Sequence, residues 1–478
     1  MMKKILFSIT VIVLMCFLGF NTFSQGYKIS VKINGIKDTT LLLGHHFADK
    51  KFVKDTIRVD ENGFGIFEGK EKLDGGIYLI ILPWMTYFEI LMPEDQVFYI
   101  ETDTADYVKN MKITGSVQNQ KFNDYQAFMG KKQTQMSELN KKLEASKENE
   151  AEVKRLREEM KKMDKEVKDN WKRISAENKG TLFGNVINAM RSPEIPEFEI
   201  PEFYENKDSV KQMWQYLYNK NHYFDHIDFS DDRLLRTPLF ESKMGHFFKK
   251  IIIQAPDTLI RETKEFIDKT RVNDEMFKYA VNYLLVHYSS SKIMGMDEVL
   301  VFVGESYYLS GEAFWADSTH LAKIRERVEK ISPNIIGKIA SDMKLITYDN
   351  KVVTLHGIDT KYTIIAFWEP GCGHCKKLIP KLHEVYSRLF DANKSVEVIA
   401  IFTQVKEKDE WVEFIEKNAI TDWINAYDPY GWSNFRNNYD IYSTPVIYLL
   451  DKSKKIIAKR IDVEKIEEFI ENYEKYNK

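Results

Sequence analysis

The chain has 478 residues, which is long for one ordinary domain, so we expect about three folded parts. Hydrophobic residues make up 44% of the chain and charged residues 29%, a balance typical of globular proteins. The formal net charge of −3 gives no reason to propose a nucleic-acid partner, and we expect none.

Residues 1–24 have the pattern of a cleavable secretory signal peptide. Two lysines precede an apolar run from residue 5 to residue 20, and the small Ser24 offers a cleavage point. An uncleaved membrane anchor is the alternative, but the run is short for a membrane span. A lipid anchor on Cys16 is disfavoured, because a methionine precedes it and the apolar run continues past it. We therefore expect export to the periplasm or cell envelope.

Residues 25–117 predict an antiparallel β domain. Apolar and polar residues alternate in short runs, as in residues 29–33 and 78–82. Turn-forming pairs such as Asn34-Gly35 and Asn62-Gly63 separate these runs, which favours compact strand pairing.

Residues 118–192 predict a helical hairpin at the start of an all-α middle region. Apolar residues recur at steps of three and four from Leu156 to Ile174, and a shorter seam occupies residues 136–143. The polar residues 146–149 separate the two seams, as a turn between antiparallel helices would. A dimerising coiled coil is the alternative, so the oligomeric state stays open.

The middle region continues as a predicted helical domain over residues 193–330. Prolines at 193, 196 and 201 indicate an extended linker at its start, and aromatic-rich helical segments follow. We find no motif with chemical meaning in residues 25–330, and their role stays open.

Residues 331–478 predict an α/β domain. A buried strand at 363–368, a helix at 375–389 and a strand at 396–402 form a βαβ unit. A helix at 408–417, strands at 446–450 and 455–460, and a final helix from residue 463 follow.

Cys372 and Cys375 lie where the first of these strands ends and the long helix begins. Unpaired backbone N–H groups and the helix dipole stabilise a thiolate at that position. We expect Cys372, at the tip, to attack a disulfide and Cys375, one turn further, to be shielded and to resolve the mixed disulfide. The chain without residues 1–24 has no other cysteine, the usage expected of a redox catalyst in an oxidising compartment.

The segment from residue 367 to residue 380 resembles the active-site strand, redox motif and helix of the thioredoxin superfamily. Trp368 and Pro370 match positions beside the site, and Pro380 matches the helix-kinking proline of the family. This resemblance implies a thioredoxin-like fold for residues 331–478.

A second signature of the superfamily matches residues 442–445, which end in Thr444 and Pro445. In the family this proline is cis and faces the disulfide, and the residue before it offers backbone hydrogen bonds to the bound substrate chain. The resemblance therefore implies that Thr444 and Pro445 help to bind the client protein.

Within the superfamily, the domain resembles the exported TlpA, ResA and DsbE group, and the upstream arrangement resembles multidomain envelope proteins of gut-type bacteria. The resemblance implies a thiol–disulfide oxidoreductase that acts on client proteins with disulfides, without a cofactor and with a membrane electron donor.

Three positions depart from the family pattern. Gly371 replaces the tryptophan usual before the first cysteine, Ala366 replaces a buried acid, and Leu378 stands where ResA-like proteins have a carboxylate. No obvious buried base remains. Glu369 is the nearest acid in sequence, and we consider it either a proton carrier or a solvated loop residue.

Gly373 and His374 are expected to tune the cysteine pair. The dipeptide resembles that of protein disulfide isomerase, whose potential is about −180 mV against about −270 mV for thioredoxin. A partly charged imidazole near the helix start would stabilise the thiolate and so the reduced form. The resemblance to the TlpA-like group implies a reductant instead. We therefore expect a reduction potential between these two values, and we favour a reductase or isomerase over a net oxidant.

Other functions fit the sequence less well. A structural zinc site needs four ligands, so we expect no metal. A peroxiredoxin-type peroxidase does not normally place its nucleophile in a Cys-x-x-Cys pair. The remaining alternative is an envelope ligand- or partner-binding protein with an accessory thioredoxin domain, although both cysteines and the proline loop favour catalysis.

Overall fold

The computed structural model describes residues 26–476, which form two compact units, one ending at Ile251 and the other starting at Ile252. The predicted signal peptide and Cys16 lie outside the described residues. No helix within residues 26–476 has the length and apolar character needed to span a membrane. The unit boundary falls inside the stretch 193–330, and the domain boundaries expected from the sequence stay a prediction.

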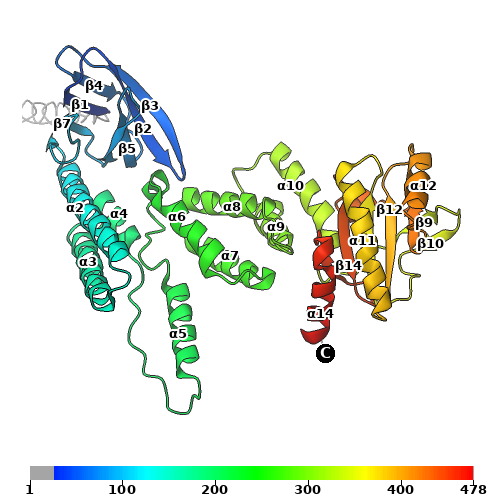
Figure 1. The fold of residues 1–478 in the computed structure, drawn as a ribbon. Helices are drawn as coiled ribbons and strands as arrows, with labels where there is room; N and C mark the ends of the chain where they lie inside the picture. Colours follow the sequence, from blue (N-terminus) through cyan, green and yellow to red (C-terminus); the bar gives the residue numbers. More distant parts are fainter. Residues whose placement is uncertain (1–25, 477–478) are drawn as a thin grey trace, which may run out of the picture. The chain divides into compact units, whose positions relative to one another are not determined.

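The first unit begins with two four-stranded sheets, drawn in blue in Figure 1. Their strand orders are β4-β1-β7-β8 and β3-β2-β5-β6. The strands are β1 (Tyr27–Asn34), β2 (Thr40–Phe47), β3 (Lys50–Arg58), β4 (Phe64–Gly69), β5 (Gly76–Ile81), β6 (Tyr87–Met92), β7 (Val97–Asp103) and β8 (Lys112–Thr114). Alternate side chains of both sheets, such as Ile29 and Ile80, meet in one apolar core.

One strand pair differs from the antiparallel pattern expected for this domain. β1 pairs with β7 in parallel, whereas β1 with β4 and β7 with β8 are antiparallel. The alternation of apolar residues shows which face of a strand is buried, but it does not show which strand lies next to it. The sequence pattern therefore could not reveal that β1 pairs with β7.

Helices make up the rest of the first unit. They are α2 (Val117–Ala145), α3 (Glu150–Glu177), α4 (Leu182–Met190), α5 (Lys207–His222), η1 (Asp232–Arg236), α6 (Leu239–His246) and η2 (Phe247–Ile251). Leu139 of α2 packs with Leu156 and Met163 of α3, so the two apolar seams meet within one chain. Figure 1 shows α2 and α3 running side by side.

The second unit opens with helices and continues with the α/β fold. The helices are α7 (Pro256–Thr270), α8 (Asp274–Ser289), α9 (Asp297–Val303), η3 (Gly304–Leu309), α10 (Ser318–Ile331) and η4 (Ser332–Asn334). The seven-stranded sheet has the order β10-β9-β13-β12-β11-β14-β15. Its strands are β9 (Lys344–Thr347), β10 (Val352–Thr354), β11 (Tyr362–Trp368), β12 (Val396–Phe402), β13 (Ile424–Tyr427), β14 (Val446–Leu450) and β15 (Ile456–Lys459).

The central strand β11 is buried along its whole length, as expected for a strand covered on both faces. Trp368 faces one apolar core with residues of α11 (Gly373–Asp391), α12 (Lys408–Lys417) and α14 (Ile466–Tyr476). Phe367 faces the other core, which includes Phe435 of α13 (Phe435–Asn438). A short turn, η5 (Val463–Lys465), precedes α14.

The parallel strands β11, β12 and β13 direct their carboxyl ends to one edge of the sheet. Ligands and reacting groups collect at this edge in open α/β sheets, and the cysteine pair follows β11 there. The predicted fold class of a β domain, an all-α middle region and a thioredoxin-like α/β domain is confirmed.

Candidate active site

Packing at the end of β11 positions the cysteine pair. Trp368 is fully buried, and its ring lies 5.0 Å from the ring of Phe414 on α12. Pro370 is buried in the loop that follows, and Cys372 then caps α11. The backbone N–H of Cys375 donates to the Cys372 sulfur at 3.5 Å, so the first turn of the helix holds this sulfur in place.

The two thiols have opposite electrostatic environments. Burial opposes ionisation of Cys372, but hydrogen bonds from the backbone N–H of Cys375, the Cys375 thiol and the backbone N–H of His374 together lower its pKa. Cys375 has 0% exposure, and burial raises its pKa to about 12. Cys372 is therefore the thiol that ionises more readily and faces solvent.

The proline loop lies against the attacking sulfur. The Thr444–Pro445 peptide bond is cis. The Cys372 thiol donates to the carbonyl oxygen of Thr444, with 3.4 Å between the sulfur and the oxygen. The structure thus brings together the two segments that carry the family signatures, which are separated by about 70 residues of sequence.

Glu369 is part of this arrangement. The Thr444 hydroxyl donates to Glu369 Oε1 at 2.7 Å, which joins the cysteine loop to the proline loop. The Glu369 residue is half-buried, so it is neither a core acid nor a freely solvated loop residue. Ala366 is fully buried and Leu378 half-buried, so neither departure from the family pattern opens a polar site.

The remaining predicted site residues lie around the first turns of α11. His374 and Gly373 are exposed, and a Cβ atom on Gly373 would meet nothing within 4 Å. A Cβ atom on Gly371 would lie 3.6 Å from Glu407 Oε2, which is ordinary contact. Pro380 lies inside α11 and is half-buried.

A polar clamp, which the sequence patterns do not reveal, lies beside the proline loop. Asp440 is 4% exposed, and its carboxylate contacts Arg327 of α10 at 2.6 Å and Arg460 at 3.2 Å. Arg327 also donates to the Tyr442 hydroxyl at 3.1 Å. No local signal marks these residues, because 113 positions separate Arg327 from Asp440.

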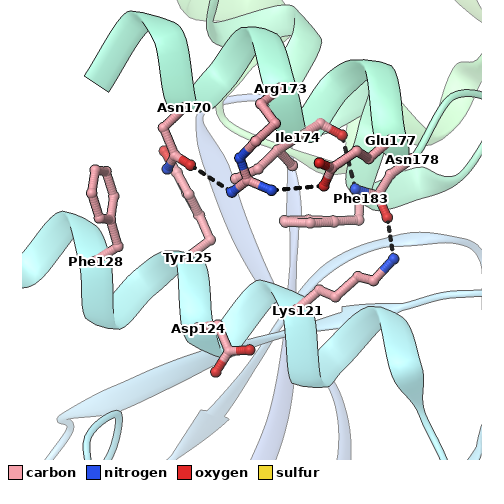
Figure 2. Close-up of a pocket in the computed structure, with 10 residues that line it drawn as sticks. All are labelled: Lys121, Asp124, Tyr125, Phe128, Asn170, Arg173, Ile174, Glu177, Asn178 and Phe183. Carbon is pink, nitrogen blue, oxygen red and sulfur yellow. Dashed lines mark hydrogen bonds and ion pairs between the residues drawn. The ribbon is translucent and has the colours of Figure 1, made fainter. Parts of the chain in front are cut away.

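A cavity of about 310 Å³ lies in the first unit, between α2, α3 and the start of α4 (Figure 2). Arg173 pairs there with Glu177 at 2.7 Å, and Lys121 donates to Asn178 at 2.6 Å. The lining residues include no cysteine or histidine, so this cavity offers no thiol chemistry. Across residues 26–476 no group of three His, Cys, Asp or Glu side chains could hold a metal ion.

Comparisons with known proteins match two parts of the chain to described families. Residues 359–456 match a family described as thioredoxin-like, and residues 150–334 match a domain of unknown function (DUF5106). The chain is similar to the thiol-disulfide oxidoreductase ResA of Bacillus thuringiensis, with 29% identity over 138 residues, 29% of this chain and 76% of that protein.

Two further similarities concern thioredoxins. Thioredoxin of Rickettsia prowazekii is 30% identical over 81 residues, which cover 13% of this chain and 77% of that protein. Among solved structures, a thioredoxin-like protein from Bacteroides caccae has 22% identity and a TM-score of 0.46, and the match covers 59% of this chain and 100% of that one.

Proposed function

The chain belongs to the thioredoxin superfamily and is like its TlpA, ResA and DsbE group, and from this premise we propose that it exchanges thiols and disulfides of client proteins in the cell envelope. The observation that carries the proposal is the contrast between Cys372, with its lowered pKa at the start of α11, and the buried Cys375. The contact between Cys372 and Thr444 places the attacking sulfur beside the expected client-binding loop.

The reaction transfers two electrons to the client. The Cys372 thiolate attacks one sulfur of the client disulfide, that S–S bond breaks, and a mixed disulfide forms while the other client sulfur leaves as a thiolate. Cys375 then loses its proton and attacks the Cys372 sulfur, which releases the second client thiolate. The client takes up two protons, and the enzyme retains a disulfide between Cys372 and Cys375.

Proton transfer at Cys375 is the demanding step, because a thiol with a pKa of about 12 is protonated at neutral pH. The client thiolate that leaves in the first step is one base that can accept the Cys375 proton. We propose Glu369 as a second proton acceptor, supported by its hydrogen bond to Thr444 beside the cysteine pair.

We propose that the enzyme works in the reductase or isomerase direction. Hydrogen bonds to the Cys372 sulfur favour the reduced form and so raise the reduction potential, which by itself favours isomerisation or oxidation of clients; the reductase direction is supported by the family resemblance alone. The resemblance to the TlpA-like group favours a membrane electron donor that returns the enzyme to its dithiol form. The envelope location rests on the signal-peptide pattern of residues 1–24.

Reduction of insulin disulfides by dithiothreitol tests the activity. The full chain should accelerate the reaction, and the Cys372→Ser variant should leave the uncatalysed rate. Exposed Lys417, at the end of α12, provides a matched control, because Lys417→Gln should keep wild-type activity. A wild-type protein no faster than Cys372→Ser would favour the partner-binding alternative.

A further inference from the structure

A cavity of about 330 Å³ in the second unit begins beside the proline loop. We call it the Ser443 cavity, because Ser443 lines it and directly precedes Thr444, the residue in contact with the Cys372 sulfur. Consecutive Cα atoms are about 3.8 Å apart, so the cavity starts one residue from the site of attack. The cavity and the Cys372 sulfur therefore contact neighbouring residues of the same proline loop.

Six charged side chains line the Ser443 cavity, with four cations against two acids. They are Lys292, Asp297, Arg327, Asp440, Lys459 and Arg460. Lys292 and Asp297 come from the α8–α9 region and Arg327 from α10, whereas the other three belong to the thioredoxin-like fold. The helices before this fold therefore build part of a cavity next to the cysteine pair.

Each acid of the cavity forms an ion pair, although Asp297 Oδ1 is buried with no hydrogen-bond partner among the described residues. Asp297 forms an ion pair with Lys459, which is 5% exposed and also donates to Asn334 at 2.9 Å. This pair is neutral overall, with Lys459 buried and Asp297 half-buried. Asp440 is buried between Arg327 and Arg460, so one carboxylate is shared by two guanidinium groups.

The accessible charge in the cavity is positive. The side chains of Arg327 and Arg460 remain 38% and 50% exposed, and Lys292 is exposed. Each guanidinium group has five N–H donors. The two arginines together therefore offer more donors than the single Asp440 carboxylate can accept. A concave site with unbalanced positive charge attracts anions, and an arginine fork matches a carboxylate.

We infer that the Ser443 cavity binds the carboxylate of an Asp or Glu residue that flanks the attacked cysteine, so that the enzyme prefers client disulfides in acidic surroundings. The inference rests on the proposed thiol–disulfide activity. It gives the helices α8 to α10 a part in client selection, through Lys292 and Arg327.

Peptide disulfides test this preference with the full chain. Each peptide carries Glu, Gln or Lys at one of the three positions on either side of the attacked cysteine. At the position that reaches the cavity, the Glu peptide should have a kcat/KM about three- to ten-fold higher than the Gln peptide, because it gains one or two partly solvated ion pairs. The Lys peptide should have a lower kcat/KM than the Gln peptide. The difference should lie in KM and shrink at high salt.

Charge-neutralising variants locate the effect. Arg460→Gln and Lys292→Gln should each reduce the preference for Glu, and Lys292 is exposed, so its replacement leaves the buried Asp440 contacts intact. Lys417→Gln should keep the full preference. Equal turnover of the Glu, Gln and Lys peptides would overturn the inference and leave the activity standing. Absence of turnover with every peptide would overturn the proposed function and this inference with it.

Discussion

Replacing His374 with proline removes a backbone N–H group that hydrogen-bonds the Cys372 sulfur. His374 is the second residue of α11. Proline is tolerated in the first turn of a helix, because N–H groups there have no partner within the helix. The His374→Pro variant should therefore keep α11 and lose one donor to the thiolate.

The size of the effect follows from that single hydrogen bond. Because Cys372 is partly exposed, we take a solvent-screened value of about 0.5–1.5 kcal/mol for the lost donor. The pKa of Cys372 should therefore rise, because the thiolate loses one hydrogen-bond donor. For a two-electron couple about 1.4 kcal/mol equals 30 mV, so the reduction potential should fall by about 10–30 mV.

Equilibration with glutathione buffers measures this potential. The wild type should lie between about −180 and −270 mV. His374→Ala is the matched control, because it removes the imidazole and keeps the N–H group. We expect the potential of His374→Pro to be lower than that of His374→Ala. Equal potentials would refute the contribution of the N–H group, and a wild-type value below about −260 mV would refute any role of His374 in raising the potential.

Further outcomes follow from the same site. A free thiol has a pKa of about 8.5, and the pKa of Cys372 is lowered, so its alkylation rate should reach half its maximum below that pH. Mass spectrometry should find Cys375 unmodified, because it is buried and its pKa is raised. Glu369→Gln should slow the release of the client from the mixed disulfide about ten-fold or more, as measured by quenched-flow trapping. The pH dependence of Cys372 alkylation should stay close to that of the wild type. Trp368→Ala should lower the free energy of unfolding by about 3–5 kcal/mol in urea titrations, because it empties a fully buried site at the end of β11.

The sequence was most informative where one segment determines both structure and chemistry. The buried run of β11 and the apolar face of α11 place Cys372 at a helix start without any knowledge of the rest of the fold. The position of Thr444 against Cys372 followed from the family signature, because no local pattern brings residues 72 positions apart together.

Long-range polar contacts escaped prediction for the same physical reason. The hydrogen bond between Thr444 and Glu369 joins two loops, and the clamp of Arg327 on Asp440 joins a helix of the middle region to the thioredoxin-like fold. Neither contact has a period or spacing in the sequence. The Ser443 cavity depends on both regions, so it could be recognised only in three dimensions.

Trapping of mixed disulfides tests the division of roles between the cysteines most directly. The full-length Cys375→Ser variant, incubated with a disulfide-containing protein, should accumulate a mixed disulfide through Cys372, since the resolving thiol is gone. The Cys372→Ser variant should accumulate none, because the remaining thiol is buried and its pKa is raised to about 12. Mixed disulfides that form in Cys372→Ser and not in Cys375→Ser would contradict the assignment of Cys372 as the attacking thiol.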